Sequence, residues 1–260
     1  MNDFLKVTSK DNDVIKLASK LVASAKARRE NKMFVLDGLR LCRDAAQNGF
    51  PIKYFIVSES ALAKFSDDTG FIADKSQKNI VVPEYLIEKI SDTVNPQGFI
   101  LICEMKDTSS FEFVSDGRYI ALENLADPSN LGAISRSAEA FAFDGIIIDK
   151  NGCDPYNPKA LRASMGALLR IPVIVCDNFT NTIENSNLHT YAAVVDKEAT
   201  TINTVCFEKG SIALIGNEAN GLTAETVAAS TTKVTIPMTG KAESLNAATA
   251  AAIIMWEMSR

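Results

Sequence analysis

The second half of the chain alternates short apolar runs with helical segments, and this alternation constrains the fold most strongly. From Arg118 onward, strands are predicted over 119–124, 145–149, 172–175, 190–195, 211–216 and 234–237. Helices are predicted between them, including one from Leu131 and one over 158–170. Strands that are apolar throughout and alternate with helices are typical of a parallel sheet covered on both faces. We expect an α/β domain over residues 118–260.

The first hundred residues predict a second, smaller α/β unit. Helices are predicted over 14–27 and 39–49, and strands over 33–38, 54–58, 79–83 and 98–104. The stretch 106–117 is polar and has no clear period, so we interpret it as a linker. The expected organisation is a domain at 1–105, a linker at 106–117 and a domain at 118–260.

Composition excludes several classes of function. The chain opens on MNDFLKVTSKDND, which lacks the basic start and apolar run of a signal peptide. No apolar stretch approaches the roughly 20 residues of a membrane span. The five cysteines are scattered singly, which indicates reduced thiols in a cytoplasm and neither zinc nor disulfides. The single histidine, His189, excludes a histidine-rich metal site. We expect a cytoplasmic protein without membrane contact or bound metal.

Charge is distributed unevenly along the chain. The net charge is −5, yet residues 1–50 hold ten Lys and Arg against six Asp and Glu. The densest basic patch comprises Lys26, Arg28, Arg29 and Lys32. Such a patch is suited to contact the phosphates of a nucleic acid, or it is a solvated helix face.

Three loops that follow predicted strands hold the candidate functional residues, because ligands of parallel sheets bind beyond the carboxyl ends of the strands. The first loop leads into a helix with Asn130 and Arg136. Asn130 could instead be only a helix N-cap, and Arg136 only a surface partner of Glu139 at i+3. Residues Asn130 and Arg136 alone therefore do not decide between a site and a structural role.

The second and third loops raise the same alternatives. In the second loop, Gly216 permits close backbone approach, Gly221 permits an unusual dihedral angle, and Glu218 lies between them as either a functional or a solvated carboxylate. In the third loop, Ser244 or Asn246 could merely cap the last helix, whose alanines at 247–252 allow close packing.

Together the three loops resemble the motifs of the SpoU (TrmH-like) family of RNA ribose 2′-O-methyltransferases, which belongs to the SPOUT superfamily. The matching stretches, in order, are DPSNLGAISRSAEAF, LIGNEANGL and IPMTGKAESLNAATA. Residues 20–49 are similar to the substrate-binding domain of many members, which resembles ribosomal protein L30 (an L30e-like domain). Ala142 departs from the family pattern, because that position is often glycine.

The resemblance implies a fold and a cofactor. Family members bind S-adenosylmethionine in a trefoil knot near the C-terminus, which is a rare exception to normal chain topology. Carried over to this chain, cofactor binding is assigned to Leu214, Gly216, Ile236, Met238 and Leu245. S-adenosylmethionine has no phosphate, which agrees with the absence of GxGxxG and GxxxxGK[ST] motifs.

The resemblance also implies catalytic residues, a substrate and an assembly. The family match assigns the active site to Asn130, Arg136, Glu218, Ser244 and Asn246. Because a guanidinium is a poor base, our hypothesis is that Arg136 binds a phosphate and stabilises the developing alkoxide. The expected partners are RNA, with 23S ribosomal RNA preferred over transfer RNA, and a second copy of the chain in a homodimer.

Two other functions stay open at this point. A non-catalytic RNA-binding relative would keep the fold without turnover, although the complete residue set argues against it. A nucleotide-dependent oxidoreductase on a similar sheet would need a glycine fingerprint after Leu122, which the sequence lacks.

Overall fold

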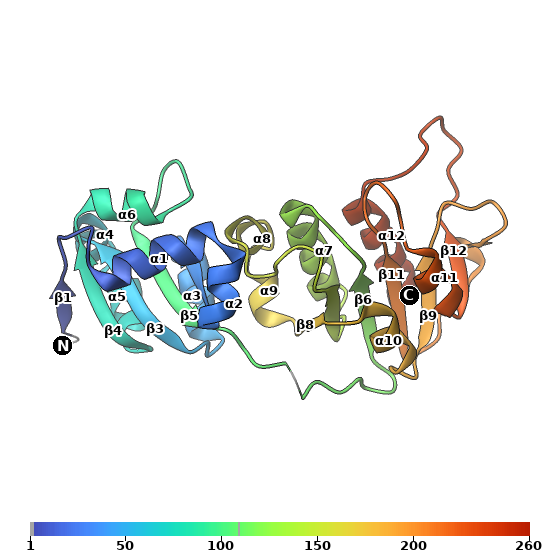
Figure 1. Cartoon of the computed structure of the whole chain (residues 1–260), viewed down its shortest axis with the longest axis horizontal. Helices are drawn as coiled ribbons and strands as arrows, with labels where there is room; N and C mark the ends of the chain where they lie inside the picture. Colours follow the sequence, from blue (N-terminus) through green and yellow to red (C-terminus); the bar gives the residue numbers. More distant parts are fainter. Residues whose placement is uncertain (1–2, 109) are drawn as a thin grey trace. The chain divides into compact units, whose positions relative to one another are not determined.

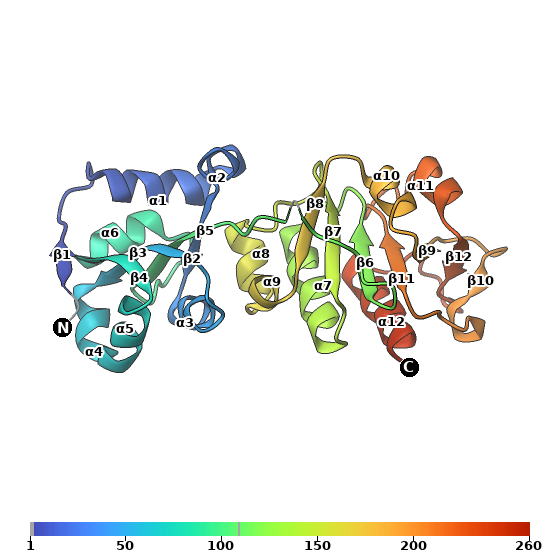
Figure 2. The ribbon, with the colours of Figure 1, turned by 90° about the horizontal axis from the view of Figure 1, so that it is seen from below.

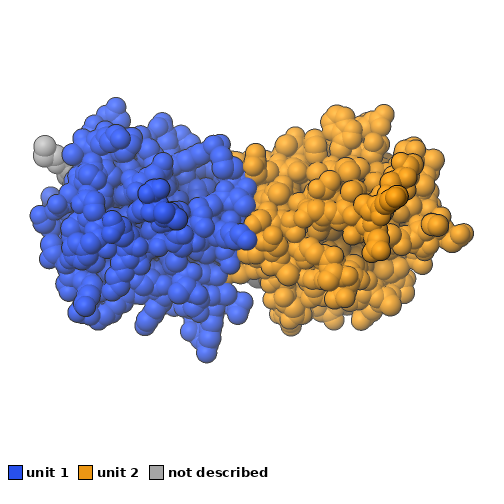
Figure 3. All heavy atoms as spheres, turned by 90° about the horizontal axis from the view of Figure 1, so that it is seen from above, with its two compact units in different colours: residues 1–107, 156–169 blue, residues 108–155, 170–260 orange. Residues whose placement is uncertain are grey.

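The computed structural model of the chain describes residues 3–108 and 110–260 (Figure 1). The chain forms two compact units, residues 1–107 with 156–169 and residues 108–155 with 170–260, which Figure 3 colours separately. Each unit is built around its own sheet. Both units contain helices and strands in alternation, as the sequence predicts.

The first unit is a five-stranded mixed sheet between two layers of helices. Its strands, in spatial order, are β1 (Phe4–Lys6), β4 (Ser76–Val82), β3 (Ile52–Ser58), β5 (Phe99–Glu104) and β2 (Met33–Asp37). Its helices are α1 (Asp13–Ala23), α2 (Ala25–Asn31), α3 (Leu39–Gln47), α4 (Glu59–Lys64), α5 (Ser66–Ala73), α6 (Glu84–Ile90) and α8 (Pro158–Ala163). Helices α1 and α6 pack on one face, where Ile56 of β3 joins their core. Phe55, the next residue in β3, stacks on Phe99 at 5.9 Å in the other core layer.

Two predicted helices are each interrupted, for local reasons. The helix expected over 14–27 breaks at Ser24, whose hydroxyl accepts from the N–H of Ala27 at 3.2 Å and so begins α2. The helix expected over 158–170 breaks into α8 and α9 (Ala167–Arg170) at Met165, whose φ is +51°. A non-glycine residue in this left-handed conformation ends an α-helix.

The segment 156–169 belongs to the first unit, which a single interdomain break does not predict. The ring of Tyr156 lies 4.5 Å from that of Phe34, and α8 packs on β2. The stretch expected as a linker is also partly anchored, because Phe113 packs edge-on against Tyr119 at 5.1 Å in the second unit. Residue 109 of that stretch lies outside the described residues.

The second unit confirms the predicted parallel sheet. Its seven strands, all paired in parallel, run in the order β10 (Thr200–Thr201), β12 (Thr232–Thr235), β9 (His189–Ala193), β11 (Ser211–Ile215), β6 (Arg118–Leu122), β7 (Gly145–Asp149) and β8 (Val173–Cys176). Helices α7 (Pro128–Ala140) and α12 (Ala247–Ser259) cover one face, and α10 (Phe179–Glu184) and α11 (Ala224–Ala229) cover the other (Figure 2). The trefoil knot that the family resemblance implies stays a prediction.

Helix α7 differs from the sequence interpretation at its start. Asp127 is its N-cap and accepts from the N–H of Ser129 at 2.9 Å, with Pro128 in the first turn. Asn130 therefore lies inside the helix and is not the cap. The alternative pairing of Arg136 with Glu139 is also absent, because Glu139 accepts from Arg170 Nη2 at 2.8 Å.

The carboxyl end of α7 closes in a Schellman arrangement. The N–H of Phe143 donates to the carbonyl of Ala138 at 2.9 Å, and that of Ala142 donates to Glu139 at 3.1 Å. Ala142 takes φ +53°, a conformation that favours glycine. This explains in backbone terms why glycine suits the position.

Candidate active site

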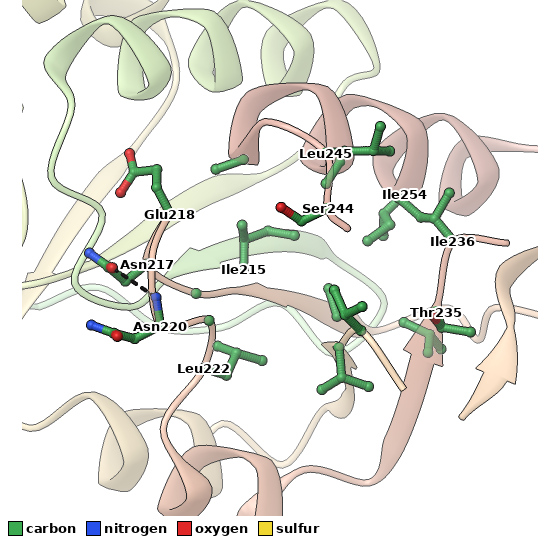
Figure 4. Close-up of a pocket in the computed structure, with 18 of the residues that line it drawn as sticks. Ile215, Asn217, Glu218, Asn220, Leu222, Thr235, Ile236, Ser244, Leu245 and Ile254 are labelled. Carbon is green, nitrogen blue, oxygen red and sulfur yellow. Dashed lines mark hydrogen bonds between the residues drawn. The ribbon is translucent and has the colours of Figure 1, made fainter. Parts of the chain in front are cut away.

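A cavity of about 440 Å³ lies in the second unit, beyond the carboxyl ends of β9, β11 and β12 (Figure 4). This is the edge at which the sequence places the functional loops. Its lining residues are Ala193, Val194, Val195, Ile215, Gly216, Asn217, Glu218, Ala219, Asn220, Gly221, Leu222, Val234, Thr235, Ile236, Met238, Ser244, Leu245, Ala247, Ala250 and Ile254. Of these described lining residues, Glu218 alone carries a charge. The volume is within the roughly 300–1,000 Å³ of small-molecule sites.

A tight loop after β11 forms one wall of the cavity. Asn217 and Gly221 exchange both backbone hydrogen bonds, at 3.0 and 2.9 Å. A Cβ on Gly216 would lie 2.0 Å from the carbonyl carbon of Gly221, so only glycine fits there. Gly221 itself takes φ +68°, as its predicted role requires. The loop thus presents backbone atoms to the cavity.

The side chain of Asn217 holds this loop in shape. Its Oδ1 accepts from the N–H groups of Ala219 at 2.9 Å and Asn220 at 3.2 Å, the latter drawn as a dashed line in Figure 4. Its Nδ2 donates to the carbonyl of Asn124 at 2.8 Å, which ties the loop to the end of β6. Sequence reasoning missed Asn217, although it adjoins Glu218 and has the turn-forming side chain that the loop needs.

Glu218 is held at the start of α7 by donors of the first loop and of the helix itself. Its Oε1 accepts from Asn130 Nδ2 at 2.7 Å and from the N–H of Asp127 at 3.3 Å, and its Oε2 accepts from the N–H of Ala126 at 3.2 Å. Partial burial acts to raise the pKa of the Glu218 carboxyl, but the hydrogen bonds outweigh it and lower that pKa below its usual value. The carboxylate is therefore ionised and fixed in place.

Asn130 and Asn246 continue this network in one direction. Asn246 Nδ2 donates to Asn130 Oδ1 at 3.0 Å, while Asn246 Oδ1 accepts from the N–H of Ala248 at 2.9 Å as the N-cap of α12. A carboxylate accepts only, so Asn130 must turn its amide group to Glu218 and its carbonyl to Asn246. The network fixes the orientation of both asparagines.

The remaining predicted catalytic residues have different surroundings. Ser244 lines the cavity and is exposed, and it does not cap α12, since Asn246 does. Arg136 is exposed on α7, roughly 9 Å along the helix from Asn130 at 1.5 Å per residue. Among the described residues it has no hydrogen-bond or ion-pair partner. The structure thus joins Asn130, Glu218 and Asn246 and leaves Arg136 open to solvent.

Four of the five residues assigned to cofactor binding line the cavity, namely Gly216, Ile236, Met238 and Leu245. Leu214 does not line the cavity, because it is fully buried in the core shared with α10. Adjacent residues of a strand face opposite sides of a sheet, and Ile215 is the one that lines the cavity.

The predicted basic patch lies around α2 and is only partly exposed. Lys26, Arg29 and Lys32 are exposed, and Lys26 lies 3.7 Å from Glu30. Arg28 is wrong as a phosphate contact, because it is 3% exposed and its Nη1 donates to the carbonyl of Leu21 at 2.6 Å. The guanidinium satisfies the end of α1, whose last carbonyls lack helical partners.

The second unit, which holds this site, matches a known protein family. A model of the SpoU rRNA methylase family matches residues 117–256. The chain belongs to the SpoU rRNA methylase family. A model of an MRM3-like substrate-binding domain matches residues 12–101. As a SpoU family member, the chain is an RNA methyltransferase.

Several proteins are similar to this SpoU family member along nearly the whole of its chain. RlmP of Bacillus subtilis (strain 168), a 23S rRNA (guanosine(2553)-2′-O)-methyltransferase, is 25% identical over 263 residues, which cover 97% of this chain and 98% of RlmP. An AdoMet-bound rRNA methyltransferase from Sinorhizobium meliloti is 28% identical with a TM-score of 0.85, over 97% of this chain and 96% of that one. An RNA 2′-O ribose methyltransferase structure is 26% identical with a TM-score of 0.79, over 98% of both chains.

No helix among residues 3–108 and 110–260 is both long and apolar enough to cross a membrane. Within the same ranges, no group of three or more His, Cys, Asp or Glu side chains is arranged to hold a metal ion.

Proposed function

We propose that the chain transfers the methyl group of S-adenosylmethionine to a ribose 2′-hydroxyl of 23S ribosomal RNA, in the cytoplasm. The observation that carries this proposal is the cavity beside the Glu218–Asn130–Asn246 network. Similarity to RlmP along the whole chain supports the ribosomal substrate and the 2′-oxygen as acceptor. The AdoMet-bound relative supports the cofactor.

The cavity residues fit S-adenosylmethionine. Apolar side chains such as Leu222, Ile236 and Ile254 offer a surface for a flat adenine ring, and the backbone at Gly216 is bare of side-chain atoms. Among the described residues that line the cavity, the ionised Glu218 alone is charged, and it favours a cationic ligand. S-adenosylmethionine carries a positive sulfonium and no phosphate. Gly216, Ile236, Met238 and Leu245 would hold it.

The bound cofactor supplies an activated methyl group on its sulfonium. This methyl group would pass to the ribose 2′-oxygen, and the electron pair of the broken carbon–sulfur bond would stay on sulfur. The protein mainly aligns the two groups, which is worth several kcal/mol. Glu218 is a poor base, because its pKa is lowered and its oxygens accept hydrogen bonds from the first loop. Its role is to orient Asn130, and Asn130 and Asn246 with Ser244 then position the ribose.

Arg136 is proposed to contact the RNA. It is exposed on α7 outside the cavity lining, so it is free to meet a phosphate of the target strand. A planar guanidinium pairs with phosphate through two parallel hydrogen bonds and stabilises the alkoxide that develops as the hydroxyl proton leaves to water. Lys26, Arg29 and Lys32 of the first unit would contact the RNA backbone elsewhere.

A homodimer is proposed from the surface of α12. This helix is apolar around most of its surface, yet Trp256 is 53% exposed, and its ring contacts the ring of the half-buried Phe141 at a tilt, with the centroids 5.7 Å apart. Helices that are apolar all round are normally buried. A second copy packed over this surface would cover it and bring a partner close to α7. Sedimentation at micromolar concentration should show a dimer, and Trp256→Glu should shift it to monomer.

Transfer of tritiated methyl groups to total RNA tests the activity. We expect label in the large ribosomal RNA of cells that lack this enzyme, and none in RNA that the enzyme has already modified. Label in transfer RNA alone would assign the other substrate. A chain that binds the cofactor but labels no RNA would instead be a non-catalytic relative.

A further inference from the structure

The two loops that meet at the centre of the sheet hold each other through a pair of carboxylates. The loop after β6 comprises residues 123–127, and the loop after β11 comprises residues 216–223. Glu218 of the second loop accepts from the N–H groups of Ala126 and Asp127 in the first. Glu123 of the first loop accepts from the N–H of Thr223 in the second, at 2.8 Å. Each loop thus provides one carboxylate to the other's backbone.

Glu123 is built into this contact more deeply than Glu218. It is 4% exposed, and its Oε1 accepts from the hydroxyls of Thr223 at 2.8 Å and Thr226 at 2.6 Å. Thr223 is the N-cap of α11, so the carboxylate lies at the positive end of that helix. A buried carboxylate is costly unless it is fully hydrogen-bonded. No described cation is paired with it, and these neutral donors satisfy it.

Glu123, Thr223 and Thr226, which we call the clamp, lie next to the cavity but are not among its lining residues. Gly221 and Leu222 line the cavity, and Thr223 follows them directly. At the other end of the loop, the N–H of Glu123 donates to the carbonyl of Ile215 at 2.9 Å. Glu123 therefore holds the loop by hydrogen bonds at two points, Ile215 before Gly216 and Thr223 after Leu222. Between these two points the backbone forms the wall with which the cofactor is proposed to make contact.

We propose that Glu123 is a positioning residue for cofactor binding, which fixes the wall formed by residues 216–222 from behind. The proposal rests on the proposed function for the identity of the ligand. Its structural part rests only on the hydrogen bonds that Glu123 accepts from Thr223 and Thr226. Loss of the acceptor should leave the N–H of Thr223 and the hydroxyl of the buried Thr226 without this partner and so release the loop.

Glu123→Leu removes the acceptor while retaining bulk. We expect at least about tenfold weaker binding of S-adenosylmethionine by calorimetry, since the unpaired donor is costly in the closed loop. Glu123→Gln should restore binding to within about threefold, because its carbonyl can accept from Thr223 while the threonine hydroxyls turn to accept from its amide. This rescue separates positioning from a general loss of stability.

Thr190→Val is the matched control. Thr190 is 3% exposed and its hydroxyl pairs with that of Thr231 at 3.1 Å, at the opposite end of β9 from the cavity. This variant should lower stability without changing cofactor affinity. If Glu123→Leu does not fold, Thr226→Val removes one donor to the same carboxylate and should weaken binding by about threefold.

Hydrogen exchange of the ligand-free protein separates this proposal from the proposed function. Amides of residues 216–223 should exchange faster in Glu123→Leu than in the wild type, and at the wild-type rate in Thr190→Val. Faster exchange in a chain whose wild type binds no S-adenosylmethionine would support the clamp and overturn the proposed cofactor. Unchanged exchange and unchanged affinity in Glu123→Leu would overturn the role of Glu123.

Discussion

The Nδ2 amide of Asn130 donates to Glu218 Oε1 at 2.7 Å, and this bond joins helix α7 to the loop after β11. The two residues are far apart in the sequence, and each alone has a simple structural explanation. The bond shows that the amide of Asn130 is oriented by a carboxylate. Its carbonyl is then available to Asn246.

Asn246 both caps α12 and donates to Asn130, and Asn246→Ser separates these functions. Serine retains the cap, so the free energy of unfolding should change by less than about 0.5 kcal/mol. It has no amide to reach Asn130, so kcat should fall by about tenfold or more through misalignment. Chemical denaturation and single-turnover kinetics measure the two effects. Asn12→Ser, at the N-cap of α1, is the control and should leave kcat unchanged. Full activity in Asn246→Ser would show that Asn246 serves only as the N-cap of α12.

Gly216→Ala should abolish cofactor binding. The added methyl group would lie 2.0 Å from backbone of Gly221, so the loop must move, at a cost of about 1–3 kcal/mol in stability. Gly240→Ala is the control, because no atom lies within 4 Å of its Cβ position. Thermal melting with and without S-adenosylmethionine measures both variants. A ligand-induced rise in Tm for Gly216→Ala would show that the wall tolerates a side chain.

Arg136→Lys should reduce methyl transfer without weakening cofactor binding. Lysine keeps the charge but loses the two-pronged hydrogen bonding to phosphate, so kcat/KM for RNA should fall by about tenfold or more. Calorimetry with S-adenosylmethionine should give the wild-type affinity, because Arg136 is not part of the cavity lining. Wild-type turnover in this variant is the result that rejects the phosphate role.

Glu218 should make stability depend on pH in the acid range. Its folded pKa is lowered by hydrogen bonds from Asn130 and the first loop, against the opposing effect of burial. A lowered folded pKa stabilises the fold above the unfolded value of about 4.3, and this contribution is lost as the pH falls through the folded pKa. The stability difference between wild type and Glu218→Gln should therefore shrink between about pH 6 and pH 3. A constant difference over that range would show that the carboxylate has no such linkage.

Ala142→Gly should stabilise the protein. Ala142 takes φ +53° after α7, and glycine relieves the strain of a left-handed residue, worth about 1 kcal/mol. Ala133→Gly, at an exposed position in the middle of the same helix, should instead destabilise by about 1 kcal/mol. Equal effects of the two substitutions in chemical denaturation would contradict the strain argument.

The sequence predicted the parallel sheet well because its signal is local. Apolar runs of strand length between helices give the sheet and the edge at which ligands bind, and the cavity lies at that edge. Gly216 and Gly221 were also readable, since each has a backbone reason for lacking a side chain. These features need no knowledge of distant contacts.

The predictions differ from the structure at residues whose surroundings depend on distant contacts or on the face of the sheet that they occupy. Leu214 is predicted to bind the cofactor but does not line the cavity, whereas Ile215 does, because an apolar run does not reveal which face of the sheet each residue occupies. Arg28 was assigned to RNA, but a helix break at Ser24 leaves carbonyls for it to satisfy. Glu123 was overlooked because its donors at Thr223 and Thr226 come from a loop about a hundred residues later. No local pattern marks such a pair.

The most direct test of the central claim is the chemical position of the transferred methyl group. Ribosomal RNA labelled with tritiated S-adenosylmethionine is hydrolysed in alkali, which cleaves a chain only where a free 2′-hydroxyl attacks the next phosphate. The account predicts that the label is recovered in an alkali-resistant dinucleotide from 23S ribosomal RNA. Label recovered in mononucleotides, which would place the methyl group on a base, would contradict it.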